Sequence, residues 1–397
     1  MKKPLFTIAS VLLAILQVGA LGAQTAKLDY PNAPRGTVVD TYFGTQVPDP
    51  YRWMENIDSA PTKTWVDAEK NLTHSYFARI PERAAIAAHL KSIINYAKIG
   101  TPYHAGNHYF YTYNSGLQNQ SVLYTMTGIG GKARVLIDPN TLSSDGTVAL
   151  GPTAVTHDGK LIAYATQSAG SDWETWRVRS VMTGKDYPDT LLWSKFSGAS
   201  WTRDGKGFYY DRYQAPTSSA TYKAALYGQK VYYHVLGTPQ SADRLVYEDT
   251  NPTHKDYFFD ASVTEDGRYV VLTQSGGKSY NTRIYVSDLR STNPHFQPLL
   301  TRGDAQWGVV DNQGTTFFVE TDKNAPNHEI VAIDARRPGS IRTLIPQAKS
   351  AIDNVGTVGR NIFVSYLKDA HSQVDQFDMR GHLIREVGLP GVGSAGG

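Results

Sequence analysis

Few residues in this chain of 397 amino acids have the type and spacing needed for catalysis or metal binding. There is no cysteine, which excludes thiolate catalysis, disulfides and cysteine-ligated zinc or iron–sulfur sites. A serine nucleophile at a sharp strand-to-helix turn needs Gly-x-Ser-x-Gly. The closest string, VGSAG at 392–396, has valine in place of the first glycine and follows Pro390. The eleven histidines lack the His-Glu-x-x-His spacing. We therefore assign no catalytic residue, metal ligand or cofactor from these patterns, although a catalytic triad is recognised by geometry rather than by order.

The charge balance also excludes one class of partner. The chain has 39 lysines and arginines against 36 aspartates and glutamates, a net charge of +3, and two of the lysines lie at its start. Proteins that bind nucleic acid carry an excess or a cluster of basic residues that pairs with phosphates. We therefore expect no nucleic-acid partner.

The first 23 residues predict a secretory signal peptide. Lys2 and Lys3 precede an apolar stretch at 5–16, and small residues end the segment at Ala20, Gly22 and Ala23. An uncleaved membrane anchor is the alternative, but the stretch is shorter than the ~20 residues that span a bilayer. We expect an exported protein, periplasmic or secreted, with no membrane association once the leader is removed.

Two helices are predicted after a proline-punctuated extended segment. Ser59 is a candidate N-cap with Pro61 in the first turn, and Trp65, Ala68, Leu72 and Tyr76 follow at helical spacing. Apolar residues recur in the same way between Ile86 and Ile94. These are the only two convincing helical patterns.

From about Tyr103 the pattern becomes one of strands, and a single unit repeats. A polar turn with glycine precedes a strand of aromatic and β-branched residues, as in HDGKLIAY at 157–164. Six copies occur, with glycines 53, 46, 62, 47 and 45 residues apart, at Gly106, Gly159, Gly205, Gly267, Gly314 and Gly359. This spacing is typical of four-stranded propeller blades, in which glycine supplies the positive φ of a tight hairpin and the next strand is buried on both faces. Unrelated hairpins in β-sandwiches are the alternative.

Several longer strings resemble the prolyl oligopeptidase family of serine peptidases, which cut peptides after proline. They run in the family's order and include DPYRWME at 49–55, NSGLQNQ at 114–120, GSDW at 170–173, KFS at 195–197 and VYYHVLGT at 231–238. The match is close from about Tyr30 to Gly237 and weaker beyond it. Together the strings are far more specific than any one of them.

The resemblance implies a mainly β fold, a prolyl oligopeptidase-type β-propeller preceded by a short helical segment that packs on an α/β-hydrolase domain. The family has seven blades, and its hydrolase domain, with the Ser, Asp and His of the triad, follows the propeller. Six blade repeats are visible here, so we expect the N-terminal part of such a protein, without its catalytic domain and last blade. The expected organisation is a signal peptide at 1–23, an extended and helical segment at 24–100 and an incomplete propeller at 101–397.

Two substrate-binding residues also follow from the resemblance. An aromatic residue at the position of Phe196, between Lys195 and Ser197, helps to form the family's apolar pocket for the peptide. Phe258 is expected to line the same cavity, on a weaker match of its surroundings. Ordinary packing in a blade core is the alternative for both side chains.

We therefore expect the propeller region of an exported prolyl endopeptidase, in which the propeller admits short proline-containing peptides and excludes folded proteins. Its partner is the hydrolase domain of the same chain, the chain alone is inactive, and the complete protein is a monomer. A free-standing propeller that binds peptides or acts as a scaffold is the alternative. A related peptidase of other specificity is less favoured, because the NSGLQNQ and GSDW strings resemble the proline-cleaving branch.

Overall fold

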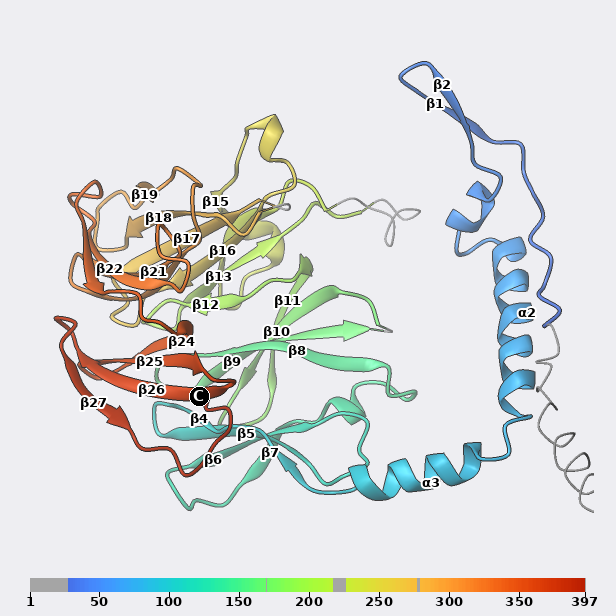
Figure 1. Cartoon of the computed structure of the whole chain (residues 1–397), viewed down its shortest axis with the longest axis horizontal. Helices are drawn as coiled ribbons and strands as arrows, with labels where there is room; N and C mark the ends of the chain where they lie inside the picture. The colour runs from blue at the N-terminus through green and yellow to red at the C-terminus, as the bar shows by residue number, and fades with distance from the viewer. Residues whose placement is uncertain (1–27, 169, 217–225, 277–278, 397) are drawn as a thin grey trace, which may run out of the picture. The chain divides into compact units, whose positions relative to one another are not determined.

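The computed structural model describes residues 28–168, 170–216, 226–276 and 279–396 (Figure 1). The chain divides into two compact units, Met1–Ile94 and Asn95–Gly397, so the division falls six residues before the predicted start of the propeller. The predicted signal peptide lies outside the described residues.

The first unit contains the two predicted helices. Ser59 caps the longer one, since its side chain accepts a hydrogen bond of 3.3 Å from the Thr62 amide, and proline lies in the first turn, where its missing N–H costs nothing. The elements are β1 (Val39–Tyr42), β2 (Thr45–Pro48), η1 (Arg52–Glu55), α2 (Ala60–Phe77) and α3 (Arg83–Ile94). Neither helix in this described region is long and apolar enough to cross a membrane.

The second unit is a six-bladed β-propeller, as predicted. Blade 1 contains five strands and each of the others four, paired antiparallel with neighbours in chain order apart from β3 and β4, which both pair with β5. Blade 1 is formed by β3 (Lys98–Ile99), β4 (Tyr103–Ala105), β5 (His108–Asn114), β6 (Val122–Thr127) and β7 (Arg134–Ile137). Blade 2 is formed by β8 (Val148–Val155), β9 (Leu161–Ser168), β10 (Trp173–Ser180) and β11 (Asp186–Lys195). Blade 3 is formed by β12 (Ala199–Trp201), β13 (Gly207–Arg212), β14 (Lys230–Val235) and β15 (Arg244–Tyr247).

Blades 4 to 6 repeat the same arrangement. Blade 4 is formed by β16 (Phe258–Val263), β17 (Tyr269–Ser275), β18 (Thr282–Asp288) and β19 (Gln297–Leu300). Blade 5 is formed by β20 (Trp307–Gln313), β21 (Thr316–Thr321), β22 (Glu329–Asp334) and β23 (Ile341–Ile345). Blade 6 is formed by β24 (Ala351–Val358), β25 (Asn361–Lys368), β26 (His371–Asp378) and β27 (Leu383–Val387). Three short 3-10 helices lie in the connections: η2 (Pro139–Thr141), η3 (Gln240–Ala242) and η4 (Pro252–His254).

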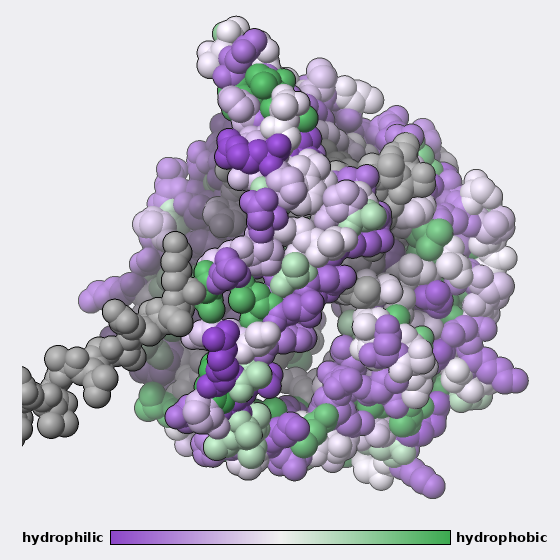
Figure 2. All heavy atoms as spheres, turned by 90° about the vertical axis from the view of Figure 1, so that its right-hand side faces the viewer, coloured by the Kyte–Doolittle hydropathy of each residue, from purple (hydrophilic) through white to green (hydrophobic). Residues whose placement is uncertain are grey.

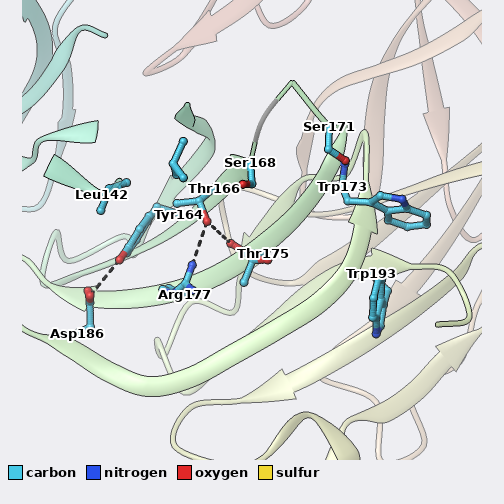
Figure 3. Close-up of a pocket in the computed structure, with 11 residues that line it drawn as sticks. Leu142, Tyr164, Thr166, Ser168, Ser171, Trp173, Thr175, Arg177, Asp186 and Trp193 are labelled. Atoms are coloured by element: carbon cyan, nitrogen blue, oxygen red, sulfur yellow. Dashed lines mark hydrogen bonds between the residues drawn. The ribbon is translucent and has the colours of Figure 1, made fainter. Parts of the chain in front are cut away.

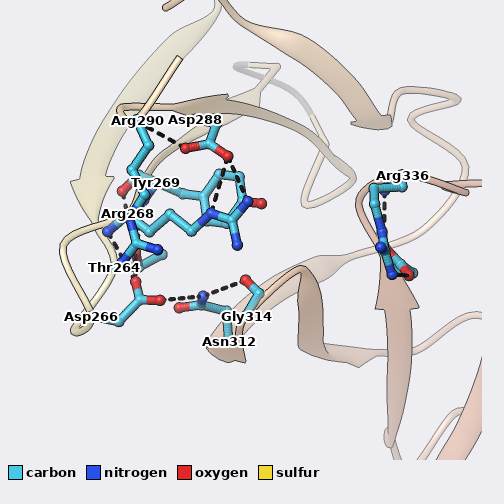
Figure 4. Close-up of polar contacts among 10 residues, drawn as sticks. Thr264, Asp266, Arg268, Tyr269, Asp288, Arg290, Asn312, Gly314 and Arg336 are labelled. Atoms are coloured by element: carbon cyan, nitrogen blue, oxygen red, sulfur yellow. Dashed lines mark hydrogen bonds and ion pairs between the residues drawn. The ribbon is translucent and has the colours of Figure 1, made fainter.

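The repeated turn glycines lie where the sequence predicts them. All six have φ between 59° and 75°; Gly106 lies between β4 and β5 of blade 1, and the other five lie between the first and second strands of their blades. In blade 4 the Thr264 hydroxyl donates to Asp266 Oδ1 at 2.7 Å, and the Arg268 amide donates to the same oxygen at 3.0 Å (Figure 4). Asp266 Oδ2 accepts from Asn312 of blade 5 at 3.1 Å, so this turn also joins two blades. Side-chain bonds of this kind fix a tight turn locally, which is why the motif is visible in the sequence.

In blades 2 to 5 the second strand is buried on both faces, because each of these blades packs between two others. In β9, Ile162 and Tyr164 pack against blade 1, whereas Ala163 and Ala165 pack against blade 3. The alternation follows from the two-residue period of a strand. Equivalent apolar clusters lie between blades 3 and 4, 4 and 5, and 5 and 6. The core is therefore a series of inter-blade layers.

The surface view in Figure 2 shows hydrophilic residues spread over one face of the molecule, with hydrophobic residues in small groups between them. Apolar side chains exposed in this way are normal for proteins in water. The described residues of this face therefore form no broad apolar surface.

Candidate functional site

Phe196 lies in the three-residue connection between β11 and β12, outside the core. Its side chain is 63% exposed, which excludes the blade-core alternative for this residue. Its backbone has φ +53°, a left-handed conformation that costs a non-glycine residue about 1–2 kcal/mol. A strained and exposed aromatic residue is held by its surroundings rather than by its own packing.

Phe258 is the first residue of β16 and is partly buried. Its neighbour Phe259, only 5% exposed, points the other way and belongs to the cluster between blades 3 and 4. The two-residue period of the strand therefore leaves Phe258 on the face opposite to the packed one.

Phe196 and Phe258 come from the same end of two adjacent inner strands. The Ser200 hydroxyl of β12 accepts a hydrogen bond of 2.8 Å from the Val263 amide of β16. Two residues before Ser200, a Cβ added to Gly198 would lie 3.5 Å from Asp260 Oδ1. The two strands therefore run in the same direction, and the structure brings both predicted residues to one end of the propeller.

Lys195 and Trp173 surround the Phe196 connection. The Lys195 ammonium lies 5.4 Å from the centroid of a Trp173 ring and 5.5 Å from that of Phe196, and it pairs with Asp172 at 3.3 Å. Cations at such distances are attracted to ring faces. Trp173 also packs edge-to-face on Trp193, with ring centroids 5.8 Å apart.

The two tryptophans form one wall of a groove of about 450 Å³ in blade 2 (Figure 3). At its other end the Tyr164 hydroxyl donates to Asp186 at 3.0 Å, and burial raises the pKa of Tyr164 to about 12. Burial by itself would raise the pKa of Asp186, but the hydrogen bond and charge of Arg179 together with the Tyr164 hydrogen bond outweigh burial and lower it. Sequence reasoning did not assign these residues, although Trp173 ends the GSDW string that carried part of the resemblance.

No hydrogen bond between a serine hydroxyl and a histidine ring is found in the described part of the chain, and in the same residues no group of three His, Asp or Glu could hold a metal ion. What the geometry offers is aromatic surface with one nearby cation, suited to apolar segments of an extended ligand.

Comparison with known proteins agrees with this architecture. A family described as "Prolyl oligopeptidase, N-terminal beta-propeller domain" matches residues 31–397. A prolyl endopeptidase of Elizabethkingia miricola is 38% identical over 98% of this chain and 54% of its own length. Prolyl oligopeptidase A of Galerina marginata is 31% identical over 92% of the chain and 54% of its own length.

Solved structures give the same result. A prolyl endopeptidase structure from a study of inter-domain dynamics is 37% identical, with TM-score 0.70, over 93% of this chain and 53% of that one. Prolyl oligopeptidase B of Galerina marginata, bound to a 25-residue macrocyclization substrate, is 28% identical with TM-score 0.82. The match covers 92% of this chain and 54% of that one. The chain thus spans about half the length of the relatives that it matches. It belongs to the prolyl oligopeptidase family, whose N-terminal β-propeller domain it contains.

Proposed function

We propose that this chain is the propeller region of an exported serine endopeptidase that cleaves short peptides after proline. In this proposal the propeller restricts access to small peptides, and the hydrolase domain of the same protein supplies the triad. The observation that supports it most directly is that the exposed Phe196 and the partly buried Phe258 lie at the same end of two adjacent strands. A relative of the same family has been solved with peptide substrates of 25 and 35 residues.

Peptide binding to the 397-residue chain tests the first part. We expect a fluorescein-labelled hexapeptide with one central proline to bind, as measured by fluorescence anisotropy. Phe196→Ala should weaken binding about tenfold, since a buried aromatic side chain contributes on the order of 1–3 kcal/mol. Ile129→Ala is the matched control, because Ile129 is 86% exposed in the loop between β6 and β7, at the opposite end of the strands. Equal affinity of the wild type and Phe196→Ala would contradict the assignment.

Hydrolysis is tested separately. We propose that these 397 residues alone do not cleave a chromogenic Gly-Pro substrate, and turnover that co-purifies with the chain would contradict this. A free-standing peptide-binding or scaffold module is the second candidate. The reading frame downstream of the Gly397 codon distinguishes the two: a continuing frame with Gly-x-Ser-x-Gly favours the peptidase, and a natural stop favours the module.

Export is the third part of the proposal and rests on the residue pattern at 1–23. We expect the protein to appear outside the cytoplasm with an N-terminus near Gln24, as read by intact mass. A cytoplasmic protein that retains Met1 or its first residues would contradict export.

A further inference from the structure

Two acidic side chains are buried directly beneath the Phe196 connection. Glu174 of β10 is 3% exposed and Asp211 of β13 is 2% exposed. Neither forms an ion pair with a described lysine, arginine or histidine. Buried carboxyl groups without a cation are costly, and they persist where hydrogen bonds hold them.

Hydrogen bonds link these groups into one continuous network. Glu174 accepts from the Ser197 amide at 3.3 Å and from the Phe196 amide. The Ser197 hydroxyl accepts from the Asp211 amide at 3.3 Å, and the Asp211 carboxyl accepts from Gln229 Nε2. The network therefore runs from blade 2 into blade 3.

Gln229 extends the network into blade 4. Its side-chain oxygen accepts a hydrogen bond of 2.6 Å from the Phe259 amide, next to Phe258. Gln229 is itself only 2% exposed. One end of the network thus holds the backbone of Phe196, and the other holds the backbone beside Phe258.

We propose that Glu174, Asp211 and Gln229 are positioning residues, whose buried network fixes the Phe196 connection relative to the start of β16 so that both aromatic side chains can bind one peptide. The proposal rests on the proposed function of Phe196 and Phe258. It also explains how Phe196 keeps its left-handed backbone, because the amides of Phe196 and Ser197 both donate hydrogen bonds to the Glu174 carboxyl.

Electrostatics supports this role. Burial raises the pKa of Glu174 to about 7, and the charge of Asp172 adds to the effect. Burial also raises the pKa of Asp211 well above its usual value, with further contributions from Asp260 and Glu174. Lys195, which directly precedes the Phe196 connection, pairs with Asp172. Because ionisation of Glu174 is disfavoured in this conformation, raising the pH through 7 shifts the population toward conformations in which the carboxylate is solvated and the connection is released.

The test uses the 397-residue chain and the labelled proline hexapeptide. Glu174→Leu removes the acceptor at similar volume and should weaken binding about tenfold. Glu174→Gln keeps an acceptor and should stay within twofold of the wild type at pH 6. The wild-type affinity should fall as the pH rises from 6 to 8, whereas that of Glu174→Gln should stay constant. Glu386→Leu, at an exposed position of β27, is the matched control.

A readout without peptide keeps the inference separate from the proposed function. Amide hydrogen exchange of residues 195–198, measured by mass spectrometry, should be at least tenfold faster in Glu174→Leu and unchanged in Glu174→Gln. If Glu174→Leu does not fold, Gln229→Leu replaces it, with faster exchange expected at residues 258–260.

The outcomes are distinguishable. If Phe196→Ala and Phe258→Ala leave binding unchanged, the proposed function fails and the positioning role fails with it, whatever the exchange shows. If both weaken binding but Glu174→Leu or Gln229→Leu alters neither binding nor exchange, only the positioning inference is overturned. A wild-type pH profile that Glu174→Gln reproduces would also overturn it.

Discussion

His234 in β14 lies fully buried between two carboxylates. Its Nε2 is 2.8 Å from Asp189 Oδ1 in β11, and its Nδ1 is 2.7 Å from Asp243 Oδ1, just before β15. Asp189 Oδ1 also accepts from the Gly237 amide at 2.6 Å. Since each ring nitrogen faces an acceptor, both carry hydrogen and the ring is an imidazolium. The group therefore joins blade 2 to blade 3 through a buried cation.

The perturbation that tests this is His234→Gln, which leaves Asp189 and Asp243 buried without a cation. Removal of one partner from a buried pair costs about 3–5 kcal/mol, because the remaining charge is uncompensated. We expect the free energy of unfolding at pH 6, from urea titration followed by tryptophan fluorescence, to fall by about that amount. His382→Gln is the matched control, because His382 is 75% exposed and lies 3.0 Å from Asp378. It should change stability by less than about 1 kcal/mol.

The difference between wild type and His234→Gln should also depend on pH. Burial alone would lower the pKa of His234, but its hydrogen bonds to Asp243 and Asp189 outweigh burial and raise it above 6.5. A raised histidine pKa contributes stability that is complete below the unfolded pKa and is lost as the pH rises through the folded pKa. The difference should thus be largest near pH 6 and shrink toward pH 9. A difference that stays constant over this range, or one below about 1 kcal/mol at pH 6, would refute the buried imidazolium.

Three further predictions concern the core, a buried acid and a turn. Phe317→Ala should lower the free energy of unfolding by about 3–5 kcal/mol in urea titration, because the side chain is fully buried between blades 4 and 5; a loss below 1 kcal/mol would contradict that packing. The pKa of Glu174 is raised from 4.5 to about 7, so its ionisation should lower the free energy of unfolding as the pH rises from 4.5 to 7. The expected loss is about 1–3 kcal/mol after allowance for screening. Glu174→Gln should remove this pH dependence when unfolding is measured at a series of pH values. Gly314→Ala, with φ +62° and open space, should cost about 1–2 kcal/mol. Gly106→Ala should cost more, because a Cβ there overlaps the Asp158 carbonyl; equal melting temperatures would count against this difference.

The blades could be predicted from the sequence because their signals are local. A turn such as that around Gly267 is fixed by Thr264, Asp266 and Arg268, which are only a few residues apart, and the turns of blades 2 and 3 repeat the same Thr–Asp hydrogen bond. The helix starting after Ser59 was readable for the same reason, since its cap and its first turn are adjacent. Local hydrogen bonds therefore mark the first turn of blades 2 to 4 and the start of this helix.

The polar contacts between blades could not be predicted in the same way. Glu174 and Ser197 are 23 residues apart, and His234 and Asp189 are 45 residues apart. Nothing beside His234, in the string VYYHVLGT, indicates two acidic partners. Such contacts depend on which residues the curvature of the propeller brings together. The sequence of a single strand does not indicate which residues of other strands will lie next to it. The exposure of Phe196 was not predictable from its own residue type either, because it follows from the position of Phe196 in the connection between β11 and β12.

The distribution of buried charge has a physical meaning. Blades 4 and 5, and blades 5 and 6, pack through apolar clusters. The boundary between blades 2 and 3 instead holds buried Glu174, Asp189, Asp211 and His234 in addition to apolar residues. Apolar replacements of buried ionic groups are often neutral or stabilising, so these groups are not explained by stability alone. Departures from apolar packing concentrate at sites that serve function. Glu174 and Asp211 lie beside the Phe196 connection, since both bond Ser197, whereas His234 and Asp189 lie toward the other end of their strands. The first pair is therefore placed to fix the strained aromatic residue of the proposed binding surface, and the second pair joins blades 2 and 3.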